Sequence, residues 1–270
     1  MQFGVCTWTF NQSLATTAQT LTKLGFDGVE LLGDLEQYRA VEARQILSDN
    51  GLRAFSLTPA NVDISHPDAS IRKPAIDYFF RLVDFAAELG QPLISCHGLV
   101  GRIKAIGTQL EEDQLLVDAV RQIAGRAGQA GLKVIFEVLN RYETHQIHNH
   151  EQALVLLGEV GLENFGILLD AYHMNIEEAN PAEALRRTGK HLWLYHVADS
   201  NRAGIGYGHT DFKAQVQALG DINYSHPAIL ECTAPGANPF TPEKGAGWRD
   251  ILQGYLAESL RWLKDHTMAA

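Results

Sequence analysis

Residues 134–143 read VIFEVLNRYE, an apolar run that continues into a polar segment. Val, Ile and Phe favour a pleated and buried strand. Glu137 lies inside this run, where burying an unpaired carboxylate is costly. A metal ion or a fixed positive group would stabilise the ionised carboxylate there. A strand-end carboxylate paired with Lys or Arg explains this segment equally well, so the rest of the chain has to decide between the two interpretations.

Apolar runs alternate with longer amphipathic stretches along the whole chain, which is typical of strand–helix units in a parallel sheet. Eight such units predict a closed α/β barrel, a fold that takes about 250 residues, and this chain has 270. We expect strands at residues 3–7, 28–32, 53–57, 93–97, 133–138, 166–170, 192–197 and 228–231. The helical periodicity predicts helices that include 14–24, 41–50, 76–89, 113–130, 151–160 and 248–264.

Glycine marks the ends of several expected helices. It readily adopts the positive φ with which a helix ends before the chain turns into a strand. The residues in question are Gly25, Gly51, Gly90, Gly131 and Gly161. No Pro/Ser-rich linker, charge block or low-complexity tract divides the chain. We therefore expect residues 1–270 to form a single (β/α)8 TIM-barrel domain of the α/β class.

The composition argues against several classes of protein. Hydrophobic residues make up 46% and charged residues 20%, and no apolar run approaches the ~20 residues of a membrane helix. Met1 leads straight into a strand-like run without a basic region or cleavage site, so we expect a cytoplasmic protein. A net charge of -10 opposes attraction to phosphate backbones. Neither a membrane nor nucleic acid is an expected partner.

The cysteines do not predict a disulfide framework or a zinc site. Cys6, Cys96 and Cys232 are an odd number, and each has apolar neighbours. We expect all three to be reduced, buried thiols.

The carboxyl ends of the last four expected strands are unusually polar, and this is where a parallel barrel carries its functional groups. They supply Glu137, Asp170, His196 and Glu231. Any one of these alone would more often be structural. Four consecutive strands that bring metal-competent groups to one point predict a metal site. Three carboxylates and one imidazole suit Mn²⁺, Co²⁺, Mg²⁺ or Zn²⁺, and the carboxylate excess argues against a thiolate-type zinc site.

Such a site predicts chemistry beside a carbonyl group. A substrate with a ketone next to a hydroxyl could occupy open coordination positions, and its polarisation would acidify the neighbouring C–H bond. Glu137 and Glu231 come from strands well separated around the barrel. One could remove a proton and the other return one from the opposite side, which would invert a carbon.

The four-residue set resembles that of the ketose 3-epimerases, of the D-tagatose and D-psicose 3-epimerase type, in the xylose isomerase-like barrel superfamily. The resemblance covers nearly the whole chain, and its more specific elements are an Asp-x-x-His and a Gly-x-Gly-His motif. The matching segments are 25–30 (GFDGVE), 67–72 (PDASIR), 168–175 (LLDAYHMN) and 196–202 with 206–212 (GYGHTDF).

The resemblance implies a metal-dependent enzyme that epimerises a ketose at C3. Glu137, Asp170, His196 and Glu231 would bind the metal. Glu137 and Glu231 would also exchange the C3 proton, through an enediolate held at the metal. Mn²⁺ or Co²⁺ is the preferred ion, with Mg²⁺ and Zn²⁺ left open.

Three further residues are implied to hold substrate oxygens: Glu143, His173 and Arg202. Their positions agree with these roles, because Glu143 follows Glu137 on the same loop and an Arg such as Arg202 can stabilise an enediolate oxygen. The expected substrate is a small sugar. The resemblance also implies a homo-oligomer, either a dimer or a tetramer.

Several other residues have two competing interpretations. Residues 205–209 read IGYGH where family members often have Pro-Gly-x-Gly-His, and His209 either orders the metal site or caps its loop. Glu30 and His97 face the barrel mouth by strand parity, as pocket wall or as structural groups. Three aromatic residues lie at or near strand ends: Trp8, Phe10 and Tyr172. They either form an apolar wall for the sugar or belong to the core.

Related functions remain as alternatives. The same metal and glutamates would serve an aldose-ketose isomerase, a hydroxypyruvate-type isomerase, an inosose dehydratase or a ketose-phosphate 3-epimerase. The late loops have few cations beyond Arg202 and Lys213, which favours a free sugar over a phosphorylated one. A metal-dependent DNA-repair (AP) endonuclease would need more ligands and a basic face. A non-catalytic sugar or metal binder would not need two opposed glutamates.

Overall fold

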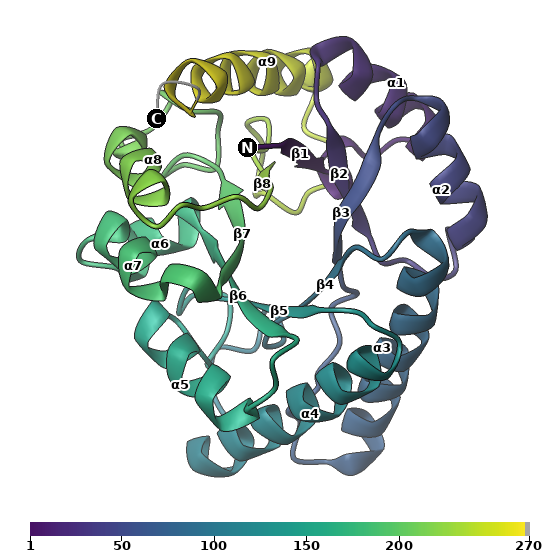
Figure 1. Cartoon of the computed structure of the whole chain (residues 1–270), viewed down its shortest axis with the longest axis vertical. Coiled ribbons are helices and arrows are strands. Elements are labelled where there is room, and N and C mark those ends of the chain that lie inside the picture. The colour runs from purple at the N-terminus through teal and green to yellow at the C-terminus, as the bar shows by residue number, and fades with distance from the viewer. Residues whose placement is uncertain (268–270) are drawn as a thin grey trace.

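The computed structural model describes residues 1–267 and has eight parallel strands that close into a barrel in chain order, with β1 paired to β8 (Figure 1). The strands are β1 Phe3–Cys6, β2 Gly28–Leu32, β3 Arg53–Thr58, β4 Leu93–Cys96, β5 Val134–Glu137, β6 Phe165–Asp170, β7 Leu192–Val197 and β8 Ala228–Leu230. All eight lie within one residue of the expected positions. The prediction of a (β/α)8 TIM barrel is confirmed.

Helices surround the barrel on its outside (Figure 1). They are α1 Leu14–Leu24, α2 Ala40–Asp49, α3 Ala69–Leu89, α4 Gln109–Gln129, α5 His150–Val160, α6 Ala171–Glu177, α7 Pro181–Thr188, α8 Phe212–Asp221 and α9 Trp248–Thr267, with short 3-10 turns η1 Thr7–Phe10 and η2 Gly189–His191. The six expected helices are all present, and their expected glycine ends are confirmed by positive φ, as at Gly25 (86°) and Gly161 (67°).

The helix that precedes β4 begins earlier than its periodicity predicts. We expected 76–89, whereas α3 begins at Ala69. Asp68 caps it by accepting a hydrogen bond of 2.7 Å from the backbone N–H of Ser70, so about two extra turns form before the apolar stripe starts. Pro74 lies inside this helix, which the pattern alone would treat as a breaker.

The barrel interior contains one layer of apolar side chains below the carboxyl ends of the strands. This cluster consists of Cys6, Phe55, Ile135, Leu168, Leu194 and Ile229. Because side chains alternate along a strand, residues two positions later point into the same interior, one layer higher. The alternation therefore directs a second set of inward-facing side chains to the barrel mouth.

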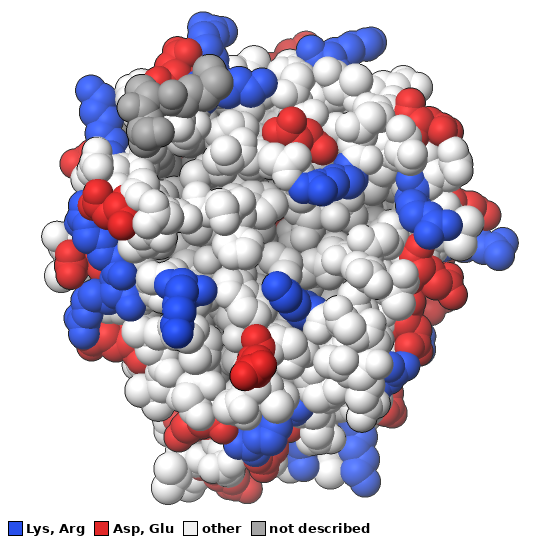
Figure 2. Space-filling model, viewed as in Figure 1, with Lys and Arg blue, Asp and Glu red and all other residues white. Residues whose placement is uncertain are grey.

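Two properties of the surface bear on partners. None of the helices in residues 1–267 combines the length and apolar character needed to cross a membrane. Figure 2 shows Lys and Arg interspersed with Asp and Glu around the end of the barrel that faces the viewer, without a continuous basic patch among the residues described on that face.

Candidate active site

The structure brings the four expected metal ligands together at the barrel mouth. Glu137 ends β5, Asp170 ends β6, His196 lies on β7 and Glu231 follows β8. Each lies two residues after an apolar side chain of the interior layer, so the strand period alone places all four in one layer. One ligand atom from each lies within 4.8 Å of the others, and all four residues are buried.

A divalent cation fits this group of atoms. Asp170 Oδ1 accepts from the backbone N–H of Tyr172 (2.9 Å), whereas its buried Oδ2 has no hydrogen-bond partner among residues 1–267. His196 Nδ1 lies 3.2 Å from Glu231 Oε2 and 3.5 Å from Glu137 Oε1. A buried carboxylate oxygen without a partner, beside two other acids and an imidazole nitrogen, is the environment expected for a hard or borderline metal ion.

Glu30 determines how His196 faces this group. Its wholly buried carboxylate accepts from Ser56 Oγ (2.5 Å) and Thr58 Oγ1 (2.6 Å) and lies 3.1 Å from His196 Nε2. A carboxylate in this setting is an acceptor, so Nε2 carries a hydrogen and Nδ1 faces the acids. Glu30 is thus a buried residue that supports the candidate ligand His196 and does not line the cavity. Of the two interpretations from the sequence, pocket wall or structural group, the second holds.

Replacing Glu30 by Gln is expected to raise the metal dissociation constant by about 10- to 100-fold, because the imidazole loses the negative partner that increases its basicity. Calorimetric titration of the metal-free protein with Mn²⁺ measures this change. Ser56→Ala is the matched control, since it removes one hydrogen bond from Glu30 and keeps its charge. Equal metal affinity in the parent and the Gln variant would contradict the assigned role.

The electrostatics show an excess of negative charge at the barrel mouth. Burial and repulsion by Glu231 raise the pKa of Asp170 to about 7, although Arg202 acts in the opposite direction. Burial would also raise the pKa of Glu231, but Arg202 and His196 outweigh burial and lower it well below its usual range. Burial would lower the pKa of His196, but Glu30 and Glu231 raise it well above its ordinary value. A proton at Nδ1 would therefore occupy the place that a cation can take.

The three expected substrate residues line the same cavity. Its volume is about 470 Å³, and its wall includes Glu143, His173 and Arg202 together with Glu137 and Glu231. Arg202 Nη2 donates to Glu231 Oε2 (2.9 Å) in a buried ion pair. Burial and the neighbouring Arg202 lower the pKa of His173 well below its ordinary value, so this imidazole stays neutral.

Asn140 links two of these residues, and the sequence analysis missed it. Its Oδ1 accepts from the Tyr142 N–H (2.9 Å), which turns Nδ2 toward Glu143 Oε1 (3.0 Å) and His173 Nδ1 (2.8 Å). Because the amide nitrogen only donates, His173 Nδ1 accepts and the ring hydrogen lies on Nε2. Nε2 is buried, lies 3.5 Å from Asp170 Oδ2 and makes no hydrogen bond among the described residues, so it is a donor without a partner beside the candidate ligands.

The aromatic wall differs in part from the expected set. Trp8 lines the cavity and donates from Nε1 to Glu231 Oε1 (3.1 Å), and Phe240 stacks near it with ring centroids 6.0 Å apart. Phe10 is wholly buried in the core, and Tyr172 lies over the Arg202 guanidinium (4.7 Å) outside the cavity lining. Phe240 lies in the irregular segment after β8, where no periodicity could have identified it.

Asp199 organises the loop after β7 that carries Arg202. Its carboxylate accepts backbone N–H bonds from residues 200 (2.7 Å), 206 (2.9 Å) and 210 (3.0 Å). A Cβ on Gly208 would lie 2.4 Å from Asp199 Oδ1, so only glycine fits there. The N–H of Ile205, where the family often has proline, donates to Ser259 Oγ (2.9 Å), a bond that proline cannot make.

Two further expectations about side chains have clear outcomes. His209 is exposed and lines a separate cavity with Asp211 and Glu178, so it does not order the metal site. The three cysteines are free and buried, as expected.

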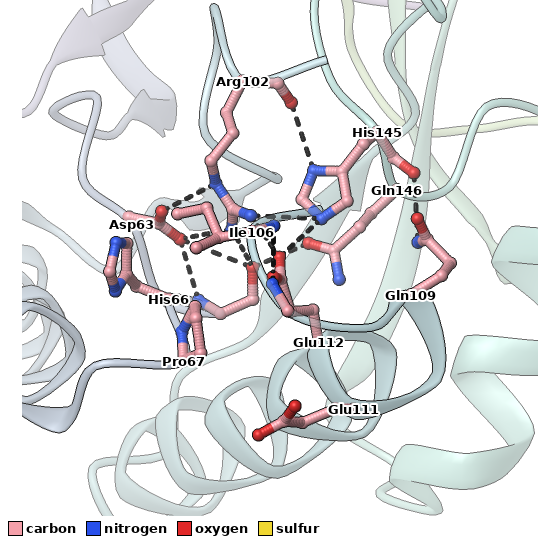
Figure 3. A network of polar contacts seen from close by, with 12 residues as sticks. Asp63, His66, Pro67, Arg102, Ile106, Gln109, Glu111, Glu112, His145 and Gln146 are labelled. Carbon is pink, nitrogen blue, oxygen red and sulfur yellow. Dashed lines mark hydrogen bonds and ion pairs between the residues drawn. The ribbon is translucent and has the colours of Figure 1, made fainter. Parts of the chain in front are cut away.

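A buried ionic network holds the wall on the β3 to β5 side (Figure 3). Arg102 binds Asp63 through Nε (2.8 Å to Oδ2) and also pairs with Glu112, and its Nη1 lies 3.3 Å from His145 Nε2. These residues come from the loops after β3, β4 and β5 and from α4. The N–H of Gly101 donates to the Glu143 carbonyl (2.7 Å), so the network also fixes the backbone of a cavity residue.

Glu112 makes the contribution of this network to the stability of the fold depend on pH. Burial would raise its pKa from 4.5, but the Gly107 N–H and Arg102, with the Ile106 N–H, outweigh burial and lower the pKa to about 2. A carboxyl with a lowered folded-state pKa stabilises the fold above its unfolded-state pKa. This contribution is lost as the pH falls through the folded-state value.

Glu112→Gln is therefore expected to lower the free energy of unfolding at pH 7 by about 3 kcal/mol. The difference from the parent should shrink as the pH falls from 4.5 toward 2. Urea denaturation at pH 7 and pH 3 measures both values. The exposed neighbour Glu111 points away from the network (Figure 3), so Glu111→Gln should change stability by less than about 0.5 kcal/mol. If Glu112→Gln lowered the free energy of unfolding by the same amount at pH 7 and pH 3, this account would be contradicted.

Comparison with known proteins identifies the family of the chain. Residues 18–266 match the family described as "Xylose isomerase-like TIM barrel". The chain is 34% identical over 229 residues to a ketose 3-epimerase of Arthrobacter globiformis, covering 82% of this chain and 78% of that protein. It is 28% identical over 269 residues to the 3-dehydro-D-guloside 4-epimerase of Escherichia coli, covering 94% and 95%.

Superposition on a solved structure supports the assignment of the fold. D-psicose 3-epimerase from Clostridium cellulolyticum H10, determined with D-tagatose, superposes with a TM-score of 0.87 over 99% of both chains at 23% identity. The chain is thus a member of the xylose isomerase-like TIM barrel family, within the group that includes the ketose 3-epimerases.

Proposed function

We propose that this protein is a metal-dependent ketose 3-epimerase. The observation that carries the proposal is the pair Glu137 and Glu231, which line one cavity from β5 and from the end of β8. Binding a sugar or a metal would not require two carboxylates beside one reacting carbon, whereas moving a proton between two faces of that carbon does. The 34% identity to a ketose 3-epimerase supports the same reaction.

Glu137, Asp170, His196 and Glu231 would hold a divalent ion, for which Mn²⁺ or Co²⁺ is our choice. When bound, this ion supplies a Lewis acid that polarises the ketone and acidifies the neighbouring C–H bond. The fit rests on the Asp170 oxygen without a partner and on the closeness of His196 Nδ1 to two carboxylates. Mg²⁺ and Zn²⁺ can bind the same donor set and stay as alternatives.

The protein's own residues then move one proton. In one direction Glu231, whose lowered pKa makes it the carboxylate, takes the C3 proton, and the C3–H electron pair delocalises onto the ketone oxygen, which gives an enediolate. Glu137, which begins this direction as the protonated acid, gives its proton to the other face of C3 and ends as the carboxylate, and in the reverse direction the two residues exchange roles. Trp8 Nε1 and Arg202 Nη2 each hold one oxygen of Glu231, which fixes the orientation of this carboxyl group.

Three side chains would hold the oxygens of the sugar. Arg202 and the Nε2–H of His173 are donors for the developing enediolate oxygen. Glu143 is an acceptor for a hydroxyl group. Burial raises the pKa of Glu143, with Arg202 and the Asn140 hydrogen bond acting in the opposite direction. We further propose a dimer or tetramer, on the family resemblance.

A second candidate is epimerisation at C4 of a 3-keto sugar. The full-length similarity to the Escherichia coli 4-epimerase favours it. The proton again leaves a carbon beside a ketone, so the same two glutamates would serve. The two reactions differ only in which carbon of the bound sugar lies between Glu137 and Glu231.

A panel of ketoses tests the proposal. The metal-stripped protein is incubated with fructose, psicose, tagatose, sorbose, xylulose and ribulose, with and without added Mn²⁺, and the products are separated by chromatography. We expect the C3 epimer of at least one sugar to appear only with the ion present. Full activity after verified removal of metal would rule out the metal mechanism, and an aldose product would indicate an isomerase.

A further inference from the structure

The cavity has two chemically different walls. The wall formed by the later strands carries the charged residues described above. The opposite wall, which comes from β1 to β4 and the segments that follow them, is mostly apolar, with Leu32, Pro59, Ala60 and Val100. Carbons 2 and 3 of a ketose have to lie between Glu137 and Glu231, so the rest of the sugar extends toward this second wall.

Most polar side chains on the second wall already have partners within the protein. Trp8 Nε1 donates to Glu231 (3.1 Å), and Thr58 Oγ1 donates to Glu30 (2.6 Å). Asn61 uses both ends of its amide, donating to the Val100 carbonyl (3.0 Å) and accepting from the Val100 N–H (2.9 Å). Each of these three groups therefore already has at least one partner within the protein.

His97 is different. Its ring is only 8% exposed and lines the cavity, and its Nδ1 lies 2.7 Å from the Gly98 carbonyl oxygen. Because a carbonyl only accepts, Nδ1 carries a hydrogen, and in the neutral ring Nε2 is a bare acceptor. Nε2 makes no hydrogen bond to any residue that the structure describes, and the ring belongs to neither of the two candidate metal-binding groups.

The protein holds this ring firmly beside the reacting centre. In the β4–β5 pairing Cys96 lies opposite Phe136, and His97 and Glu137 directly follow these two residues and line the same cavity. A Cβ on Gly98 would lie 2.4 Å from Thr144 Oγ1, so the backbone that accepts from His97 packs directly against the Glu143 loop. The Arg102 network fixes the residues that follow (Figure 3). A polar atom that is open to the cavity, on a ring positioned in this way, is prepared for a ligand.

We propose that His97 Nε2 accepts a hydrogen bond from a ketose hydroxyl beyond the reacting C2–C3 unit, and that this bond selects among ketoses. The proposal rests on the proposed function for its substrate class. It assigns the polar recognition on the second wall to one residue, while the apolar side chains around it contact the C–H faces of the sugar. A sugar that cannot present a hydroxyl at this place leaves Nε2 desolvated and unpaired.

Two variants separate the recognition role from a structural one. In His97→Asn the amide nitrogen can replace Nδ1–H against the Gly98 carbonyl, but nothing replaces Nε2. In His97→Gln the longer side chain brings an amide oxygen near the former Nε2 position, and the bond to Gly98 is lost. Binding of the preferred ketose and of its 4-, 5- and 6-deoxy analogues to Mn²⁺-loaded protein is measured by calorimetry, and turnover of the same sugars is measured alongside.

We expect His97→Asn to weaken binding of the preferred ketose about tenfold and His97→Gln to stay within about threefold of the parent. For one deoxy analogue, the parent and His97→Asn should bind equally well, which identifies the hydroxyl. A His97→Asn variant that binds the preferred ketose like the parent, or that weakens every analogue by the same factor, would overturn the proposal. Ketose binding without movement of the C3 proton would count against the proposed function alone, because the binding comparison still tests His97.

Discussion

Glu231→Gln, measured at saturating Mn²⁺, is expected to lower turnover by about 10²- to 10⁴-fold for both epimers of the substrate. The residue that is the base in one direction is the acid in the other, so turnover falls in both directions. Glu137→Gln is expected to behave in the same way. In both variants the amide keeps the size of the side chain but can no longer exchange a proton at C3.

The amide also weakens metal binding, so the rate counts only for variants shown to carry the ion. Glu178→Gln is the matched control, because it removes a carboxylate that pairs with His150 (3.0 Å) away from the cavity. It should turn over like the parent. A metal-loaded Glu231→Gln variant that does the same would remove Glu231 from the mechanism. Glu137 would then need another partner, for which His173, in the same cavity wall, is our next candidate.

Asp170→Asn and His196→Ala are expected to raise the metal dissociation constant more than about 100-fold, beyond the range that residues outside the ligand set reach. Asp170 contributes the buried oxygen that has no partner among the described residues, and His196 contributes Nδ1. Calorimetric titration with Mn²⁺, together with the metal content of the purified protein, measures this loss. Activity should fall in parallel and return only partly at high metal concentration.

Cys6→Ala is the critical control, because the Cys6 thiol also lies within 4.8 Å of ligand atoms of His196 and Glu231. Burial and the charge of Glu30 raise the pKa of Cys6 well above its ordinary value, so this thiol stays protonated and is a poor ligand. The Cys6, Cys96 and Cys232 variants to Ala should keep the metal and lose only about 1 to 3 kcal/mol of packing stability. Loss of metal in Cys6→Ala would instead assign the ion to the group formed by Cys6, His196 and Glu231.

The strands and the inward-facing acids were predictable because both follow from short-range patterns. Apolar runs bounded by glycine identify the strands, and the two-residue alternation then places Glu137 and Asp170 in the layer above Ile135 and Leu168. The short helix α6 was not predicted. It spans only Ala171–Glu177 and depends on Asp170, whose side chain accepts from the Tyr172 N–H.

The supports of the site could not be read from sequence, because they join residues that are distant along the chain. Asn140, in the loop after β5, orients His173 in α6, and Phe240 reaches Trp8 from the segment after β8. Glu30 faces the barrel interior by parity, as expected. Whether it lines the cavity or lies beneath it depends on its bonds to Ser56 and Thr58, which only the packed barrel shows.

Turnover in D₂O tests the central claim most directly. If Glu137 and Glu231 lie on opposite sides of C3, the proton returned to the sugar exchanges with solvent before it is delivered. NMR and mass spectrometry of the epimerised ketose should then show one deuterium at C3 and none at other carbons. Deuterium at C1 or C2 would indicate an aldose-ketose isomerase, deuterium at C4 of a 3-keto sugar a 4-epimerase, and loss of water without label a dehydratase. An epimerised product with no deuterium at C3 would contradict proton transfer through two solvent-exchanging glutamates.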